Sequence, residues 1–275
     1  MKKIIIATLI VATTFVACKK NPITGRRQVR FFPESQMIGM SATAYTGFLT
    51  ENKANVLPQS DARAAKVTEI GKKMAAAVST YMNEIGHPEL IEGFQWTYNT
   101  VDDPTVNAWC MPGGRIVFYT GILNLTANDD EIAAIMGHEI AHAVAGHGNE
   151  RMSQTVAIQG GTNVASFLLM NDTNPGLGNA ILLQSIGVGS QLGMLKFGRK
   201  HELESDKMGL IFMNNAGYDP YSAVDFWTKM SKAGGTKPPE FMSTHPSNDT
   251  RINNLTVWAP EAAEEAAKFG VNKFQ

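Results

Sequence analysis

The chain has 275 residues, 44% hydrophobic and 18% charged, so it is long enough and apolar enough to bury a complete core. Its 24 Lys and Arg against 25 Asp and Glu give a formal net charge of −1, which argues against the strongly basic surface of a nucleic-acid-binding protein. Two cysteines exclude a disulfide scaffold and a cysteine-rich zinc finger. Any metal site must therefore use His, Asp and Glu.

The first residues have the pattern of a bacterial lipoprotein signal. Two lysines precede an apolar run over residues 4–17 that is too short for a good transmembrane helix, and Cys18 follows it. Cleavage before Cys18 and acylation of its thiol would leave an exported, lipid-anchored protein. The alternative is an apolar segment with an incidental cysteine. We predict a signal peptide over 1–17, a lipidated tether or docking strand over 18–33, and one domain over 34–275.

Helical patterning comes first in the mature chain. Apolar residues spaced i, i+3, i+4 predict one helix from Ser35 or Glu34 toward Phe48 and another over residues 67–81. Two β-like runs follow, over residues 94–99 and 115–120, with a turn at 111–114 between them. These runs predict a small antiparallel sheet.

From residue 128 onward the chain is patterned as nearly all helix. Thr126 with Asp129 resembles a capping box. The predicted helices are 129–146, two Gly-punctuated stretches between 153 and 197, 199–216, 220–232, and a short final helix after Pro246.

The clearest chemical motif is His138-Glu139-Ile140-Ala141-His142. Residues four apart on a helix differ by about 40° around the axis, so the two histidines project one above the other and can hold one Zn²⁺. Glu139 is poorly placed to be a third ligand but can reach a water at the metal and act as general base. The alternative, two histidines packed in an ordinary amphipathic helix, leaves the spacing unexplained.

A catalytic zinc usually takes a third protein ligand, and the segment 199–206 supplies a candidate. Glu202 and Asp206 share a helical face, so Glu202 can bind metal while Asp206 orients a ligand histidine. His147 lies nine residues beyond His138, about 180° around a continuous helix, and is interpreted as a surface or helix C-terminal residue. Glu204 fits a solvated acidic face.

With these motifs the chain resembles the M48 family of zinc metallopeptidases, in particular its secreted bacterial lipoprotein branch. The motifs that carry the resemblance are NPITGRRQ at 21–28, NAW at 107–109, PGG at 112–114, HEIAH at 138–142, ELESD at 202–206, and STHP at 243–246 with Arg251. The resemblance implies an α+β, mainly helical, zincin-like domain with a small antiparallel sheet or hairpin at the cleft edge. It also implies one Zn²⁺ per chain, held by His138, His142 and Glu202. We assign Asp206, Arg199 and Arg251 to supporting positions around these ligands.

The resemblance also gives the hairpin a function. The strand beginning Arg115-Ile116-Val117 is expected at the edge of the cleft, where an extended substrate would add to it beside Gly113 and Gly114. Asn107 could hold substrate backbone or the developing oxyanion, or it could be a turn former. Cys110 is expected to be a packed small hydrophobe.

Two further features keep alternatives open. His245 precedes Pro246, and the resemblance places this loop near the metal. His245 could donate to the oxyanion, which we favour slightly, or act as a fourth ligand that displaces the catalytic water. The Gly-rich segment 153–197 lacks the pattern of a nucleotide-binding loop and is expected either to cover the cleft as a lid or plug, or to pack as core helices.

The sequence therefore predicts a zinc endopeptidase that is lipid-anchored in the cell envelope, facing the periplasm at the outer membrane. Its partners would be protein substrates, such as misfolded envelope proteins, and the membrane, with no nucleic acid or nucleotide. The alternative is a zinc-bearing chaperone or assembly factor that holds such proteins without cutting them.

Overall fold

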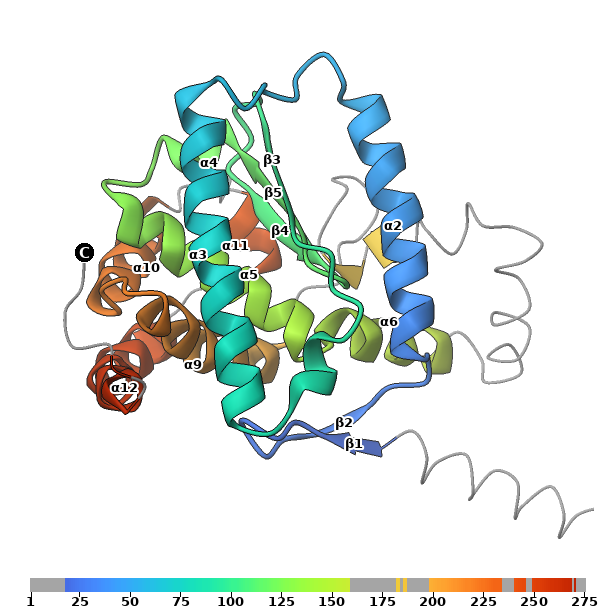
Figure 1. The fold of residues 1–275 in the computed structure, drawn as a ribbon, viewed down its shortest axis with the longest axis vertical. Coiled ribbons are helices and arrows are strands. Elements are labelled where there is room, and N and C mark those ends of the chain that lie inside the picture. Colours follow the sequence, from blue (N-terminus) through green and yellow to red (C-terminus); the bar gives the residue numbers. More distant parts are fainter. Residues whose placement is uncertain are drawn as a thin grey trace, which may run out of the picture.

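The computed structural model describes residues 18–158, 182–183, 185–186, 198–233, 240–245, 249–268 and 270. The predicted signal peptide and most of the segment 153–197 lie outside the described residues. The described part is mainly helical with small sheets, which confirms the predicted fold class (Figure 1). Its helices are α2 Glu34–Glu51, α3 Ala62–Glu84, η1 Pro88–Ile91, α4 Thr120–Leu123, α5 Asp129–Val144, α6 His147–Ile158, α9 Arg199–Asn215, α10 Tyr221–Ala233, α11 Glu240–Thr244 and α12 Asp249–Ala267. Its strands are β1 Cys18–Lys20, β2 Arg27–Val29, β3 Thr97–Val101, β4 Ala108–Met111 and β5 Arg115–Tyr119.

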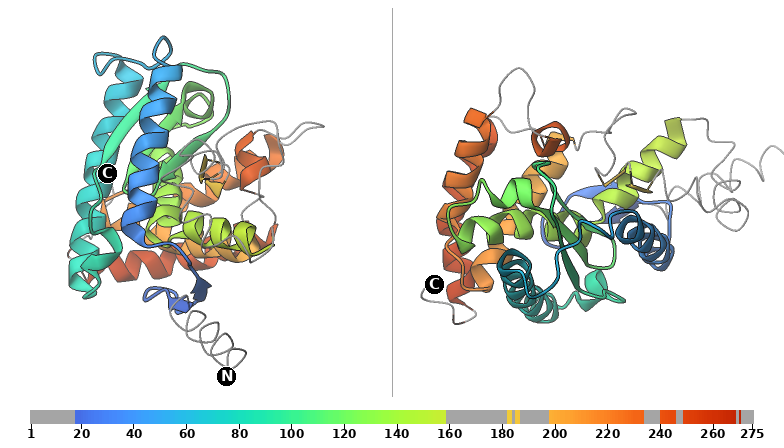
Figure 2. Two further views of the ribbon diagram at one scale, coloured as in Figure 1. Left: turned by 90° about the vertical axis from the view of Figure 1, so that its right-hand side faces the viewer. Right: turned by 90° about the horizontal axis from the view of Figure 1, so that it is seen from above.

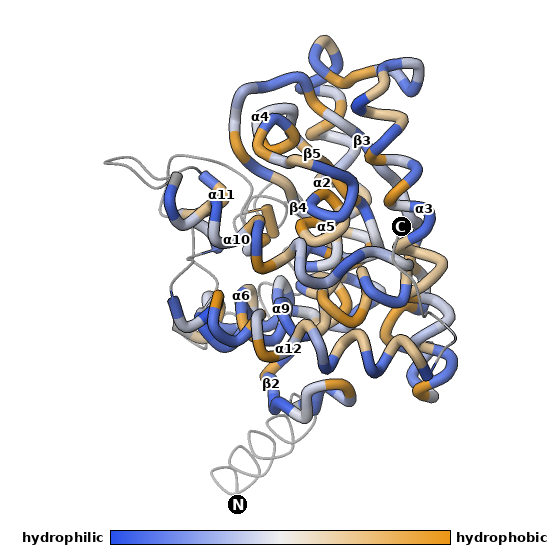
Figure 3. Tube along the Cα trace, turned by 90° about the vertical axis from the view of Figure 1, so that its left-hand side faces the viewer, coloured by the Kyte–Doolittle hydropathy of each residue, from blue (hydrophilic) through white to orange (hydrophobic). Residues whose placement is uncertain are grey.

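The core is built around α5. This helix is buried from Glu131 to Val144, and α3, α9, α10 and β4 pack around it (Figures 1 and 2). The hydropathy trace shows apolar segments at the centre of the molecule around α5 (Figure 3). A helix that is apolar on nearly every side is expected to be buried, so the polar side chains that it carries inward require partners. No helix in the described ranges has the length and apolar character needed to cross a bilayer.

The cap of α5 differs from the predicted Thr126 and Asp129 box. Asn128 is the N-cap, and its side-chain oxygen accepts a hydrogen bond from the Glu131 amide at 2.9 Å. The Glu131 carboxylate in turn accepts from the Ala127 amide at 2.7 Å, while the Thr126 hydroxyl donates to the Leu123 carbonyl. The start of the helix is fixed two residues later than the predicted cap, with three acidic residues in its first turn to complement the helix dipole.

The pairing of the sheet differs from the prediction. The two predicted strands, β3 and β5, run parallel to each other, and a third strand, β4, forms the antiparallel hairpin with β5. The turn between β4 and β5 contains Gly113 and Gly114 at φ +88° and +80°, so it reverses the chain directly and pairs β5 with the segment just before it. The strand order is β3-β5-β4, which makes β5 central and β4 outer. All four residues of β4 are buried, so it lacks the alternating pattern that would have predicted it.

The C-terminal helix is also longer than predicted. α12 has 19 residues and contains Pro260, and it packs against α9 and α10. Only a short helix was expected after Pro246. Tertiary packing on two neighbouring helices therefore outweighs the cost of an internal proline.

Helices α5 and α9 approach each other so closely that their backbones touch. A Cβ added at Gly209 would lie 2.9 Å from the His138 nitrogen and 3.0 Å from the Gly137 carbonyl carbon. Real Cβ atoms essentially never approach another atom as closely as 2.9 Å, and the atoms met here belong to the main chain, so the approach requires glycine at this position. The crossing sets the separation between the residues that α5 and α9 carry.

We expect Gly209→Ala to lower the free energy of unfolding by about 1–3 kcal/mol, because the added methyl group must push two helix backbones apart. Gly47→Ala is the matched control, since Gly47 is an exposed residue of α2 with nothing within 4 Å of an added Cβ. That change should leave stability unchanged or raise it by up to about 1 kcal/mol. Urea unfolding of both variants makes the comparison, and equal stabilities would contradict the close crossing.

Candidate metal centre

Four buried side chains meet at the crossing of α5 and α9. His138 and His142 come from α5, Glu202 from the first turn of α9, and His245 from the residue after α11. One ligand atom from each lies within 4.8 Å of the others. The structure therefore brings together the three predicted metal ligands and the residue for which two roles were left open.

The spacing of these atoms fits a tetrahedral zinc ion. His142 Nε2 lies 3.1 Å from His138 Nε2, and His245 Nδ1 lies 3.2 Å from both His138 Nε2 and a Glu202 oxygen. Ligand atoms about 2.0–2.1 Å from a zinc ion at tetrahedral corners would be about 3.3 Å apart. Three imidazoles and one carboxylate are also a donor set that zinc accepts, and buried lone pairs that face one another need a cation between them.

Glu139 lies beside this cluster and is not one of its four members. Its carboxylate is buried, with Oε1 3.5 Å from His245 Nε2. Burial raises the pKa of Glu139 above the ordinary carboxyl value. A carboxylate with a raised pKa next to a metal cluster is suited to accept and return a proton.

Asp206 and Arg251, which the sequence analysis assigned to supporting positions, contact His138 and Glu202. Asp206 Oδ1 lies 3.0 Å from His138 Nδ1, the nitrogen that faces away from the cluster. Arg251 donates two hydrogen bonds to Asp206, at 2.6 and 2.7 Å, and its Nη1 lies 2.7 Å from Glu202 Oε2. Burial alone would raise the pKa of Glu202, but its electrostatic interactions with His245 and Arg251 lower it well below the ordinary value. Glu202 therefore stays ionised, as a ligand must be.

Arg199 does not hold the supporting position predicted for it. It is exposed in the first turn of α9 and lines a surface cavity with Arg26, Arg27 and Lys200. Arg199, Glu202 and Asp206 share one face of α9, but side chains tilt toward the helix N-terminus, so Arg199 at the first position projects beyond the end of the helix. The prediction for Arg199 was wrong.

The Asn107 side chain forms hydrogen bonds with Glu240 and with the main chain of Ala108. Its side-chain amide donates to the Glu240 carboxylate at 3.1 Å, and its side-chain oxygen accepts from the Ala108 amide. The residue therefore joins the start of β4 to the start of α11. These contacts support a local structural role for Asn107, not the role of holding substrate or the oxyanion.

The predicted substrate-binding strand is not at the edge of the sheet. Arg115, Ile116 and Val117 lie in central β5, whose main chain pairs with strands on both sides. The carbonyls of Gly113 and Gly114 accept hydrogen bonds from Gln95 and Thr97 at 2.7 and 3.1 Å. These groups are already paired, so the expectation that they receive an extended substrate was wrong. Within the described sheet the outer strand on the α5 side is β4.

His147 and Glu204 were both expected at the surface, and both are buried. α5 ends at Val144, and Gly146 at φ +66° turns the chain so that α6 starts at His147 and does not continue the helix. The angle calculated along one continuous helix therefore did not apply. Glu204 does lie away from the metal cluster on α9, but the N-terminal segment covers that face. Gly146 was the sequence signal that the helix ends before His147. No local pattern in α9 indicated that Glu204 is buried.

The remaining predictions near the cluster concern Cys110 and the segment 153–197. Cys110 is buried and forms no disulfide, which confirms the predicted packed side chain, and burial raises the pKa of its thiol well above the usual value. Ile186, one of the few described residues of that segment, lines a small cavity with Glu139 and His142. It thus covers the cluster on one side.

Comparison with known proteins supports the chemistry of this centre. A model of peptidase family M48 matches residues 61–259. The chain is 29% identical over 255 residues to the mitochondrial metalloendopeptidase OMA1 of Saccharomyces cerevisiae. The matched region covers 89% of this chain and 70% of that protein. It is 30% identical over 260 residues to the human metalloendopeptidase OMA1, covering 92% of this chain and 48% of that protein.

A bacterial relative is more distant. The beta-barrel assembly-enhancing protease of Escherichia coli is 23% identical over 267 residues, covering 86% of this chain and 53% of that protein. The chain thus spans about half the length of the human and Escherichia coli relatives. All four residues of the metal cluster lie within the range 61–259 that the family model matches.

Proposed function

The chain belongs to peptidase family M48, and we propose that it is a zinc-dependent endopeptidase anchored in the bacterial cell envelope. The observation that carries the proposal is the buried cluster of His138, His142 and Glu202 with Glu139 next to it. Relatives that match most of this chain are metalloendopeptidases. Misfolded or misassembled envelope proteins are the proposed substrates.

In this proposal His138, His142 and Glu202 hold the zinc ion, one per chain. A zinc ion held there would supply Lewis-acid chemistry, because it would polarise the scissile carbonyl and lower the pKa of the attacking water. Glu139 takes a proton from that water and passes it to the leaving nitrogen, a transfer that its buried carboxylate and raised pKa favour. Asp206 and Arg251 fix the orientation of His138 and the charge of Glu202.

The substrate is proposed to bind along β4. This strand contacts α5, which carries Glu139, and it is one of the two outer strands of the described three-stranded sheet. An extended peptide can add to such an edge through main-chain hydrogen bonds, which select weakly among side chains. Weak selectivity suits a protease of unfolded proteins.

His245 suggests how the site is restrained. A catalytic zinc site keeps one position open, but here His245 fills the fourth corner of the cluster. We propose that His245 acts as an inhibitory fourth ligand in this conformation, which reverses the slight preference for an oxyanion donor. A closed site is also the observation that favours the non-cleaving chaperone as the second candidate.

The envelope location is proposed from the N-terminus and from the bacterial relative. Residues 1–17 followed by Cys18 have the lipoprotein pattern, and the Escherichia coli relative is a beta-barrel assembly-enhancing protease. The mitochondrial relatives are more similar to this chain than the Escherichia coli relative, at 29% and 30% against 23% identity, and the Cys18 variant below tests the location.

Glu139→Gln should keep about one zinc per chain and lose cleavage by on the order of a thousandfold or more, because it removes the base and no ligand. Glu202→Ala should lose the zinc. The measurements are metal content and casein cleavage for each variant. Undiminished cleavage by Glu139→Gln would contradict the mechanism, and full zinc content in Glu202→Ala would contradict the ligand assignment.

His245→Ala should raise casein cleavage several-fold while zinc stays bound, because the change opens the fourth position to water. His87→Ala, at an exposed histidine paired with Glu89, is the control and should cleave as wild type does. Slower cleavage with full zinc would instead support the donor role. No cleavage by wild type or by His245→Ala would support the chaperone.

Cys18→Ser should release the protein from the membrane fraction and abolish labelling by a fatty-acid analogue, since one thiol would carry the anchor. Cys110→Ser is the control, because Cys110 is buried and should leave the membrane association unchanged. If Cys18→Ser still sediments with membranes, another feature holds the protein there.

A further inference from the structure

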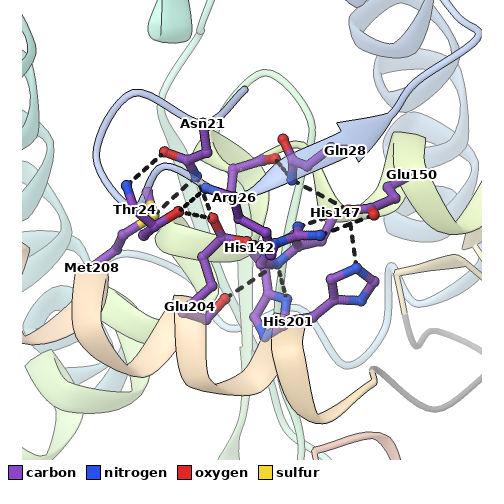
Figure 4. Close-up of polar contacts among 12 residues, drawn as sticks. Asn21, Thr24, Arg26, Gln28, His142, His147, Glu150, His201, Glu204 and Met208 are labelled. Carbon is purple, nitrogen blue, oxygen red and sulfur yellow. Dashed lines mark hydrogen bonds and ion pairs between the residues drawn. The ribbon is translucent and has the colours of Figure 1, made fainter. Parts of the chain in front are cut away.

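The N-terminal strap, which we define as residues 18–30, lies before the family match at 61–259 and yet reaches the metal centre. Its strands β1 and β2 pair antiparallel, and the chain between them turns at residues 21–26. Asn21 and Gln28 are 2% and 1% exposed, so the strap is packed into the protein. It docks along α9 and the start of α6 (Figure 4).

A line of hydrogen bonds leads from a metal-binding histidine to the strap (Figure 4). His142 Nδ1 lies 2.9 Å from His147 Nδ1, and His147 Nε2 lies 2.9 Å from Glu204 Oε2. The Ser205 hydroxyl lies farther from the same His147 nitrogen, at 3.3 Å. All of these side chains are buried.

The protons can be placed from both ends of this line. His142 turns Nε2 toward the metal cluster, so its proton is on Nδ1 and is donated to His147 Nδ1. His147 then carries its own proton on Nε2. The Glu204 carboxylate can only accept, which requires that same proton position.

Glu204 receives donors from three residues of the strap as well as from His147. One oxygen accepts from Asn21 Nδ2 at 2.7 Å and from the Thr24 hydroxyl, and the other accepts from Arg26 Nε and His147 Nε2. Burial alone would raise the pKa of Glu204, but the hydrogen bonds from His147, Thr24 and Arg26 lower it to about 2. Four donors fill a carboxylate's usual capacity, so its position is fixed by the strap.

We propose that His147 and Glu204 are positioning residues for the ligand His142, and that the strap completes the metal centre by holding Glu204. The inference rests on the proposed zinc site. His138 has its outer nitrogen next to Asp206, at 3.0 Å, and His147 gives the outer nitrogen of His142 the equivalent support. Partners of this kind fix the tautomer and ring orientation of a ligand histidine, and losing one costs about 10- to 100-fold in metal affinity or activity.

The chain offers a matched control for this proposal. Glu150 binds the same Arg26 through two hydrogen bonds, at 2.7 and 2.9 Å, and also accepts from Gln28. A further hydrogen-bonded partner is His201, whose Nε2 lies 3.0 Å from Glu150 Oε2. Loss of the Glu150 charge therefore disturbs the strap and its arginine without cutting the line to His142.

The test uses the mature full chain loaded with Zn²⁺ or Co²⁺. Glu204→Gln should raise the zinc dissociation constant by about 10- to 100-fold, measured against a competing chelator. The visible absorption bands of the Co²⁺ form, which report ligand geometry, should change. Glu150→Gln should give the wild-type dissociation constant and the wild-type Co²⁺ spectrum, whatever its effect on thermal stability.

The outcomes separate this inference from the proposed function. Wild type should bind Co²⁺, and His138→Ala should abolish this binding. If either result is not obtained, the zinc site and this inference both fail. If wild type binds Co²⁺ but Glu204→Gln and Glu150→Gln behave alike, only the positioning role fails.

The part played by the strap is tested with Thr24→Val, which removes one donor to Glu204 with little change in volume. It should weaken zinc binding several-fold in the same direction as Glu204→Gln. Because Thr24 acts through Glu204, the double variant should bind zinc as Glu204→Gln alone does. Independent, additive effects would overturn the claim that the strap acts on the metal centre through Glu204.

Discussion

The backbone contact between α5 and α9 at Gly137 and Gly209 is the constraint on which the metal centre depends. It places the two histidines of one helix opposite Glu202 of the other, close enough for their ligand atoms to surround one small ion. The same proximity excludes water, so each ionisable group here must find a partner inside the protein. The polar structure around the crossing follows from that requirement.

Two separate arrangements meet the requirement, one for each histidine of α5. His138 is supported by Asp206 and Arg251, which lie on α9 and α12 within the family match. His142 is supported by His147 and Glu204, and Glu204 depends on a segment about 180 residues away in sequence. The first arrangement belongs to the helices that form the site. The second requires the N-terminal strap to be in place.

How far the sequence predicts this site follows from the range of the interactions. His138 with His142 and Glu202 with Asp206 are i, i+4 pairs, so helical periodicity alone placed each pair on one face. His147 was misplaced because Gly146 ends that periodicity. Glu204 was misplaced because a remote segment covers its face of α9. Likewise β4 was missed because burial on both sides removes the alternation that marks a strand.

The position of His245 also depends on residues that are distant in sequence, and these residues border the proposed substrate-binding strand. Helix α11, which ends just before it, is held at its start by the Asn107 amide on Glu240 and by the Phe241 amide on the Val106 carbonyl at 3.0 Å. Residues 106 and 107 lead directly into β4, the outer strand on the α5 side. His245 and the proposed substrate-binding strand β4 are therefore both attached to the segment at residues 106–107. A displacement of the start of β4 would be transmitted through α11 to His245, because α11 is only five residues long and fixed to that strand.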